Sequence, residues 1–388
     1  MPPYLAGRQE ELEDFRELLT QKTILENLVL TGLRGVGKTV LLETFRPLAI
    51  QSGWVWVGAD LSETTSVNES NMATRLLTDL ALVTSSVVIG HRGRNQIGFA
   101  RESTQDVRTL NYAALAAIYE STPGLVSDRI KRVLEEIWLH LANRGHRGLI
   151  FAYDEAQNLA DHSEKDQYPL SLILDVFQSI QKRNIPYMLA LTGLPTLFPK
   201  LVEARTFAER MFRVVLLDRL SAADSADAIL KPIQQSDCPV VFNEYSVREI
   251  ARISGGYPYF IQYICRQVYD VFAQQHGAGV VPSVPVDEIV RKLDSDFFAG
   301  RWARATDRQR DLLGVAASLE PKNPEFTVHE LVEGSKRMLQ KPFSSSHVNQ
   351  MLASLCEIGL VYKNRYGKYS FAVPLLDQFI LRQLKTEP

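Results

Sequence analysis

Several features of specialised protein classes are missing from this 388-residue sequence. Its three cysteines, Cys238, Cys265 and Cys356, lack the paired spacing of a disulfide framework or a metal site, and its seven histidines show no ligand spacing. No apolar stretch approaches the roughly 20 residues that span a bilayer. The N-terminus has neither a basic start nor an apolar segment, so we expect no secretory signal. The expected location is the cytoplasm, without membrane contact.

A strong excess of either charge is also missing. The 43 Lys and Arg nearly balance 45 Asp and Glu, and the 45% hydrophobic and 23% charged residues are typical of an ordinary globular protein. The length suffices for two or three domains. The charge is uneven, because residues 301–388 hold 13 Lys and Arg against 9 Asp and Glu, a net +4, which leaves −6 for residues 1–300. This modest basic bias is compatible with a polyanionic partner.

One glycine-rich turn follows an apolar run at residues 28–30 and precedes a helical pattern. It reads GLRGVGKT and matches G-x-x-x-x-G-K-[ST] at every position. Its glycines let successive backbone N–H groups point at phosphate oxygens, and the following helix directs the positive end of its dipole at the same anion. We expect Lys38 to reach the β- and γ-phosphates and the Thr39 hydroxyl to ligate Mg²⁺. The expected nucleotide contacts are Gly32, Leu33, Arg34, Gly35, Val36, Gly37, Lys38, Thr39 and Val40.

A second stretch, residues 147–159 (RGLIFAYDEAQNL), contains an apolar run that ends in two acids. A buried parallel strand with this pattern delivers Asp154 and Glu155 to the carboxyl edge of a sheet. We expect Asp154 to hold Mg²⁺ and Glu155 to polarise the attacking water as a general base. The alternative is an acidic pair that merely opens a loop, and the glycine-rich turn upstream disfavours it.

A third apolar run, residues 185–197 (IPYMLALTGLPTL), contains Thr192 near its end. Thr192 either contacts the γ-phosphate or the lytic water, or it simply ends a strand, and both interpretations stay open. Arg205, Arg210 and Arg213 follow. An arginine here can act as a finger into a neighbouring subunit's nucleotide, or it can lie on a solvated helix face. Arg210 is our candidate for the finger.

Together these segments resemble the AAA+ and STAND branches of the P-loop ATPases, in particular archaeal and bacterial ATPases related to origin-recognition-type replication initiators. The resemblance covers almost the whole chain. Residues 4–15 (YLAGRQEELEDF) resemble a Gly-Arg-x-x-Glu-Leu segment beside the adenine, which implies that Gly7 and Arg8 contact the base. Residues 254–262 (SGGYPYFIQ) resemble the segment that starts a lid helix, which implies that Pro258 lies near the base.

The chain departs from the resemblance directly after this proline. Initiators often have an arginine there, which AAA+ proteins use as sensor 2, whereas this chain has Tyr259. Arg266, two turns further along, is a poor substitute. The bound nucleotide is expected to be ATP with Mg²⁺. An Asn-Lys-x-Asp segment that would read guanine is absent, and the resemblance also favours ATP over GTP.

Strand-like and helical patterns alternate in the first half of the chain. Such alternation predicts a parallel sheet flanked by helices. The strand-like runs lie near residues 28–31, 54–58, 149–153, 187–192 and 213–217. We therefore expect an α/β P-loop NTPase core of the AAA+ type at residues 1–220. Purely helical patterns then predict a lid at residues 221–300, followed by a third domain at residues 301–388.

Residues 84–124 exceed what such a core needs, and we interpret them as an insert. They include His91, Arg92, Arg94 and Arg101 among glycines and polar residues. The favoured interpretation is an exposed loop. The alternative is a segment that contacts nucleic acid or a partner protein.

The third domain has three helical segments followed by two short alternating segments around a hairpin signal, an order that resembles a winged helix. Its third helix leaves Asn349 and Gln350 facing outward, where they could read base edges in a major groove. Lys363, Arg365 and Lys368 on the wing could contact phosphates. That helix carries no Lys or Arg, so docking of a protein is the alternative.

The sequence thus predicts a Mg²⁺-dependent, slow ATPase that works as a molecular switch between ATP- and ADP-bound states. One form of output is DNA association in an oligomer, as in replication initiators. The alternative is a STAND-type signalling or defence switch whose winged helix binds a protein partner. A small-molecule kinase is disfavoured because no separate acceptor-binding segment stands out.

Overall fold

The structure is a computed structural model that describes residues 4–92, 106–236, 240–275, 284–320, 325–364 and 367–386. The chain divides into two compact units. The sheet unit comprises Gln9–Thr31 and Lys38–Leu216, and the helical unit comprises Met1–Arg8, Gly32–Gly37 and Leu217–Pro388. No helix in the described part of the chain is both long and apolar enough to cross a membrane.

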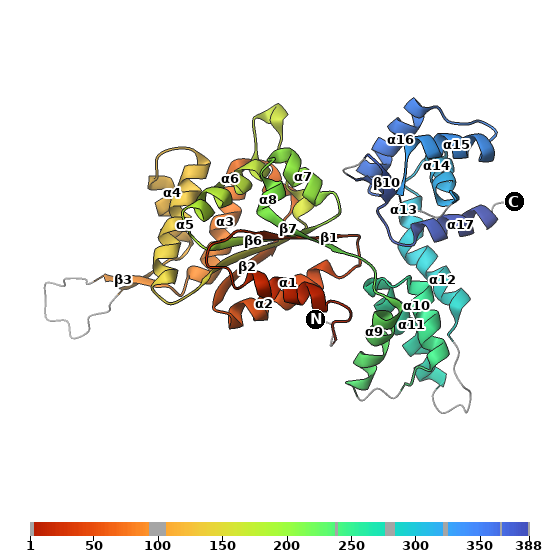
Figure 1. Ribbon diagram of the computed structural model, residues 1–388, viewed down its shortest axis with the longest axis horizontal. Helices are drawn as coiled ribbons and strands as arrows, with labels where there is room; N and C mark the ends of the chain where they lie inside the picture. Colours follow the sequence, from red (N-terminus) through yellow and green to blue (C-terminus); the bar gives the residue numbers. More distant parts are fainter. Residues whose placement is uncertain are drawn as a thin grey trace. The chain divides into compact units, whose positions relative to one another are not determined.

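A five-stranded sheet organises the sheet unit (Figure 1), in the order β2-β5-β6-β1-β7. The pairs β2/β5, β5/β6 and β1/β6 are parallel. The central strands are buried along their whole length, as expected for a parallel sheet covered on both faces. The α/β fold predicted from the sequence is therefore confirmed. The strands are β1 (Asn27–Gly32), β2 (Trp54–Asp60), β5 (Gly148–Asp154), β6 (Tyr187–Gly193) and β7 (Phe212–Leu217).

Helices cover both faces of this sheet because successive strand residues point to opposite sides. On one face, Phe15 stacks on Phe45 with ring centroids 4.1 Å apart and meets Trp56 edge-on. On the other face, Phe151 meets Phe177 edge-on at 4.8 Å. The first face carries α1 (Gln9–Leu18) and α2 (Lys38–Gln51), and the second carries α3 (Glu69–Thr84), α5 (Val126–Ala142) and α6 (Pro169–Lys182). The short α7 (Leu197–Ala204) and α8 (Ala208–Met211) follow β6.

Within the segment expected as an exposed loop at residues 84–124, the described residues 84–92 and 106–124 contain regular secondary structure. It contains an antiparallel pair, β3 (Val88–Arg92) and β4 (Asp106–Thr109), followed by α4 (Tyr112–Ser121). The helix begins where the Asn111 side chain accepts a hydrogen bond from the Ala114 N–H, and it buries Leu115. The burial of Leu115 against other parts of the fold stabilises this helix, and the local amino-acid composition does not reveal that contact. Arg94 and Arg101 lie outside the described residues.

In the helical unit the first part is all helix, as the sequence predicts for the lid. One helix runs from Val286 to Trp302 and widens into π-helical turns at its middle, so that it comprises α12, η4 and α13 in succession. The lid helices are α9 (Ala222–Gln234), α10 (Glu244–Ser254), α11 (Pro258–Gln275) and α12 (Val286–Leu293), and they lead into η4 (Asp294–Ala299) and α13 (Gly300–Trp302).

The C-terminal module, residues 303–388, combines helices with a small antiparallel sheet in the order β8-β10-β9. Its three expected helices and the expected hairpin are present. The strand β8 and the helix α17 were not predicted. The elements in chain order are α14 (Asp307–Ala317), β8 (Glu325–Phe326), α15 (Val328–Met338), α16 (Ser345–Glu357), β9 (Val361–Lys363), β10 (Tyr369–Phe371) and α17 (Leu376–Thr386).

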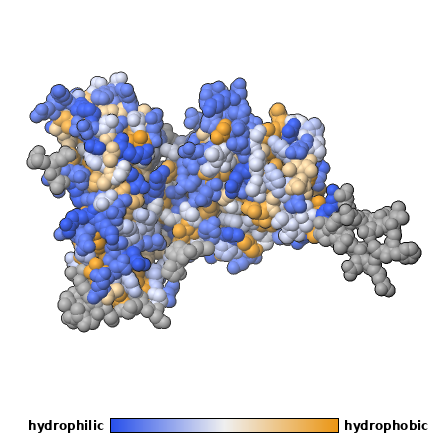
Figure 2. All heavy atoms as spheres, turned by 180° about the vertical axis from the view of Figure 1, so that it is seen from behind, coloured by the Kyte–Doolittle hydropathy of each residue, from blue (hydrophilic) through white to orange (hydrophobic). Residues whose placement is uncertain are grey.

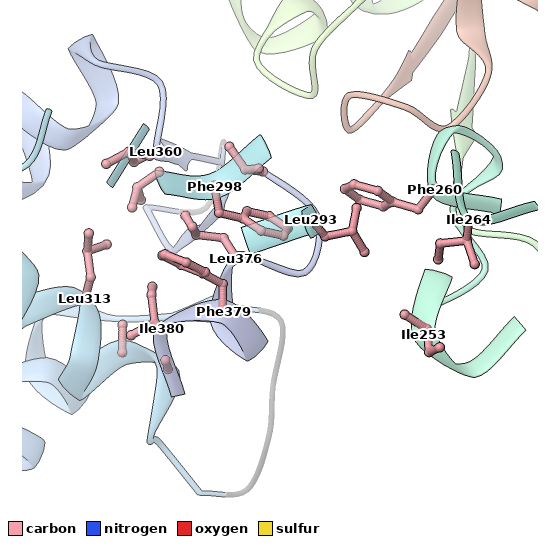
Figure 3. Close-up of a cluster of buried hydrophobic side chains, with 14 of the residues drawn as sticks. Ile253, Phe260, Ile264, Leu293, Phe298, Leu313, Leu360, Leu376, Phe379 and Ile380 are labelled. Atoms are coloured by element: carbon pink, nitrogen blue, oxygen red, sulfur yellow. The ribbon is translucent and has the colours of Figure 1, made fainter. Parts of the chain in front are cut away.

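The lid and the C-terminal module share one hydrophobic core (Figure 3). Phe298 of η4 stacks on Phe379 of α17, with ring centroids 5.3 Å apart, and lies 6.1 Å from Phe260 of α11. Asp294 of η4 forms an ion pair with Arg382 of α17. Buried aromatic contacts of this kind hold lid and module together as one packed unit.

The face shown in Figure 2 is mostly hydrophilic, and its apolar residues form small separate groups. The large apolar side chains that are exposed come from distant parts of the chain, for example Leu25, Leu82, Leu125 and Val241. Single exposed apolar residues of this kind are normal in globular proteins and indicate no particular partner.

Candidate nucleotide site

The loop Gly32–Gly37 has the backbone that its sequence requires. Gly35 and Gly37 adopt φ values of +80° and +95°, a region in which a side chain would be strained. A Cβ atom at Gly35 would also lie 2.9 Å from Cβ of Tyr259. Glycine at these positions lets consecutive N–H groups curl around an anion. The helix α2 begins directly after the loop, at Lys38.

The buried side chain of Arg8 stabilises this loop through hydrogen bonds. Its guanidinium donates hydrogen bonds to the backbone oxygens of Val36 (3.1 Å) and Asp218 (2.6 Å). Gly7 has a φ of +59°, and a Cβ atom there would lie 2.6 Å from Cγ of Asp224. The structure thus gives Arg8 a role in positioning the loop. Contact of Gly7 and Arg8 with a base stays a prediction.

The start of the lid helix α11 also contacts the loop. Pro258 occupies the first helical position, where its missing N–H costs no hydrogen bond. The next residue, Tyr259, donates its backbone N–H to the oxygen of Gly35 at 3.1 Å. The segment that the resemblance assigned to the lid is therefore adjacent to the glycine-rich loop within the helical unit. Arg266 instead forms an exposed ion pair with Asp270.

Three predicted site residues of the sheet unit meet at the carboxyl edge of the sheet. Asp154 ends β5, Thr192 lies near the end of the adjacent β6, and Thr39 lies in the first turn of α2. The hydroxyls of Thr39 and Thr192 both donate to the Asp154 carboxylate, which also accepts the N–H of Glu155 at 2.7 Å. Asp154 is 5% exposed, so these donors replace the water that its carboxylate has lost.

This cluster has the donor chemistry that Mg²⁺ prefers. It presents one carboxylate and two hydroxyls, all hard oxygen atoms. Mg²⁺ is usually held by one or two carboxylates together with substrate phosphates and water, rather than by a cage of protein ligands. Accordingly, the described residues contain no cluster of three or more His, Cys, Asp or Glu with metal-binding geometry. The residues present fit Mg²⁺ bound together with a nucleotide.

Glu155 stands in an unusual backbone conformation at the same edge. Its φ of 52° is left-handed, which is uncommon for a residue with a side chain and costs conformational energy. Its side chain is exposed rather than turned back into the core. Strain of this kind persists where the surrounding structure imposes it, which is frequent at functional sites. Asp154 and Glu155, although adjacent in sequence, therefore occupy a buried and an exposed environment.

Gln157 is a residue of this edge that sequence reasoning missed. Its amide donates to the Glu155 carboxylate, and its side-chain oxygen accepts the N–H of Leu194 at 3.2 Å. Its backbone oxygen accepts from Lys200 of α7 at 2.8 Å, and burial lowers the pKa of that lysine. Gln157 thus connects the acidic pair to the chain that follows Thr192. A glutamine in a polar loop carries no sequence signal for such a contact.

The three arginines after β6 differ in their surroundings. Arg205 is paired with Asp175 at 2.7 Å, and Arg213 is paired with Glu26 at 2.6 Å, and both contact further oxygens within the sheet unit. These ion pairs explain the positions of the Arg205 and Arg213 side chains without any contact to a nucleotide. Arg210 of α8 is exposed, and among the described residues it forms no ion pair.

The residues predicted to contact DNA lie on the surface of the C-terminal module. Asn349 and Gln350 are exposed on α16, although the Asn349 amide donates to the backbone oxygen of Ser345. Lys363 is exposed, and Lys368 lies 3.5 Å from a Glu325 oxygen. Arg365 falls outside the described residues.

Two segments of the chain match known protein families. Residues 4–185 match the family described as AAA ATPase domain, and residues 295–380 match a domain of unknown function (DUF8462). A comparison with curated proteins found no match.

Solved structures resemble the whole chain. A Walker-type ATPase of Pyrococcus abyssi is 14% identical, with the likeness covering 97% of this chain and 96% of that protein, and it superposes with a TM-score of 0.57. The ORC2 protein of Aeropyrum pernix in its ADP form is 14% identical over 100% of this chain and 97% of its own, with a TM-score of 0.57. Identities this low show the fold alone. Residues 4–185 are therefore similar to an AAA ATPase domain, and the chain shares its fold with the Walker-type ATPase of Pyrococcus abyssi and the ORC2 protein of Aeropyrum pernix.

Proposed function

We propose that this protein is a Mg²⁺-dependent ATP-binding and ATP-hydrolysing switch. The observation that carries the proposal is the cluster of Thr39, Asp154 and Thr192 at the carboxyl edge of the sheet. Within it, Thr39 lies two residues after the end of the glycine loop, whose backbone has the positive φ values of an anion-binding turn. The match of residues 4–185 to the AAA ATPase domain family supports the proposal.

Each residue has a distinct role in this proposal. The backbone N–H groups of residues 32–40 and the Lys38 ammonium bind the phosphates, while Thr39 and Asp154 hold Mg²⁺. Bound Mg²⁺ supplies positive charge that neutralises the phosphates. Glu155 accepts a proton from the attacking water, and Thr192 donates to the γ-phosphate or to that water. Gly7, Arg8 and Pro258 lie on the adenine side.

The switch has an output, which we propose is DNA association through the C-terminal module. The proposal treats the module as a winged helix, with α14, α15 and α16 followed by the hairpin β9–β10 as its wing. Asn349 and Gln350 face outward on α16, and Lys363 and Lys368 lie on the strands and turn of the wing. A protein partner is the second candidate, favoured by the absence of Lys and Arg from α16.

The core of the proposal is tested by Lys38→Ala. Removing the ammonium leaves phosphate charge unneutralised, so ATP affinity should fall by at least about one order of magnitude, as expected when a charge-assisted hydrogen bond is removed. Calorimetric titration with ATP and Mg²⁺ measures this. Lys22→Ala, which removes an equal charge from an exposed position, is the control. Unchanged affinity in a folded Lys38→Ala protein contradicts the assignment of the loop.

A further inference from the structure

Arg301 occupies an unexpected place in the helical unit. It lies in α13, at the end of the helix that leads from the lid into the C-terminal module. Its guanidinium lies over the ring of Phe297, 4.2 Å from the centroid, and donates to the backbone oxygen of the same residue. Stacking and this hydrogen bond fix the orientation of the side chain.

A short series of contacts connects this guanidinium to the glycine-rich loop. The ring of Phe297 lies 5.5 Å from the ring of Tyr259. Tyr259 in turn donates its backbone N–H to Gly35 at 3.1 Å, and its Cβ atom leaves no space for a side chain at Gly35. Gly35 directly follows Arg34, whose side chain is exposed. Arg301 is therefore held beside the loop by aromatic packing, all within the helical unit.

Arg301 has other positive charges nearby. Burial lowers the pKa of Arg301, and the positive charges of Arg34 and Arg304 lower it further, against the opposing effect of Tyr259. Among the described residues, neither Arg34 nor Arg301 forms an ion pair with a carboxylate. Two neighbouring cations without a counter-charge repel each other, and a bound anion would remove that repulsion.

We propose that Arg301 and Arg34 together bind the phosphate chain of the nucleotide held by residues 32–40. This inference rests on the proposed function, because it assumes that a nucleoside triphosphate is the ligand. In this proposal Arg301, on the helix that leads into the C-terminal module, supplies a positive charge to the phosphates. The start of the lid helix α11 carries Tyr259 and supplies no such charge. Arg301 is a binding residue in this account and takes no part in proton transfer.

The test compares ATP affinity in charge-removal variants by calorimetry at two salt concentrations. Arg301→Met keeps an apolar side chain on Phe297 and removes the charge, and it should weaken ATP binding roughly ten-fold or more. It should also reduce the salt dependence of binding, because one fewer cation then faces the phosphates. Arg34→Met on the exposed loop should weaken binding in the same direction. Arg301→Lys, which keeps the charge but loses the planar guanidinium, should lose less affinity than Arg301→Met.

Arg291→Met is the matched control, because it removes an equal charge from an exposed position on α12, earlier in the same continuous helix. Equal affinities for wild type and Arg301→Met, or for wild type and Arg34→Met, overturn the inference. An equal loss of affinity in Arg291→Met also overturns it, since the effect would then be one of general charge. A wild-type protein that does not bind ATP instead defeats the proposed function itself. Thermal unfolding of each variant verifies that it is folded.

Discussion

Two adjacent acids at the carboxyl edge of the sheet, Asp154 and Glu155, have different surroundings. Asp154 is buried and accepts three hydrogen bonds, so its carboxylate is held in one orientation. Glu155 is exposed on a left-handed backbone and receives a hydrogen bond from Gln157. A fixed carboxylate suits a metal ligand, whereas an exposed one can exchange a proton with water. Adjacent carboxylates can therefore perform different steps.

Glu155→Gln should separate binding from hydrolysis. The amide keeps the shape of the side chain but cannot accept the proton of the attacking water, so turnover should drop by roughly two or more orders of magnitude while ATP affinity is retained. Phosphate release measures turnover, and calorimetry measures affinity. Glu164→Gln, at an exposed position in the loop that follows, is the control. Wild-type turnover in Glu155→Gln would assign the base to another residue.

Asp79 is a buried acid on α3, away from this chemistry. It is 1% exposed and paired with Arg75, whose Nη2 lies 2.8 Å from a carboxylate oxygen. Burial raises the pKa of Asp79, against the opposing effect of Arg75. The folded state therefore binds this proton more tightly than the unfolded chain, whose Asp pKa is about 3.9. The stability that the protonated group contributes is complete below that value and is lost as pH rises through the folded pKa.

Asp79→Asn should reveal this dependence. The unfolding free energy of the variant, relative to wild type, should rise as pH increases from about 4 and level off above the folded pKa. Urea unfolding of both proteins at several pH values measures it. Asp166→Asn, at an exposed left-handed position that asparagine tolerates, is the control without such a trend. A difference between Asp79→Asn and wild type that stays flat or falls with pH contradicts the prediction.

At the scale of elements, the parallel strands could be predicted because burial on both faces makes them continuous apolar runs. The short strand β8 could not, because two residues carry no periodicity and its partner β10 lies more than 40 residues away in sequence. In the site, the sequence pointed to Thr39 through the glycine-rich motif, and to Asp154 and Thr192 because each lies at the end of an apolar run. Gln157 and Arg301 gave no signal, since their roles depend on contacts with distant residues.

The wing of the C-terminal module provides a test of DNA association. Charge reversal at Lys363 and Lys368 should weaken binding to duplexes of any sequence and flatten its salt dependence, with the logarithmic slope reduced by about 1 for each phosphate that is no longer neutralised. Fluorescence anisotropy at several salt concentrations, with and without ATP, measures this. Reversal of the exposed Lys22 and Lys182, in the sheet unit, is the control. No duplex binding by wild type at low salt would favour the protein partner.

At the scale of the whole molecule, the exposed Arg210 raises the question of assembly. If it enters the nucleotide site of a second copy, Arg210→Ala should lower turnover by roughly two or more orders of magnitude. A mixture of Arg210→Ala and Glu155→Gln should then recover activity, since the second variant supplies the arginine and the first supplies the base. Turnover at increasing protein concentration measures both effects.

Arg46→Ala, at an exposed arginine on α2, is the control for Arg210→Ala. The result that contradicts assembly through Arg210 is a mixture no more active than the sum of its two components.

The π-helical segment Asp294–Ala299 also bears on how this fold tolerates changes in length. Its wide turns place consecutive residues in different environments, with Phe297 against Tyr259 and Phe298 against Phe379. A π-helical turn holds one residue more than an α-helical turn, so the removal of a single residue here would restore regular winding and change which side chains face Tyr259 and Phe379. Homologous chains that keep this arrangement should therefore accept neither a deletion nor an insertion within the segment.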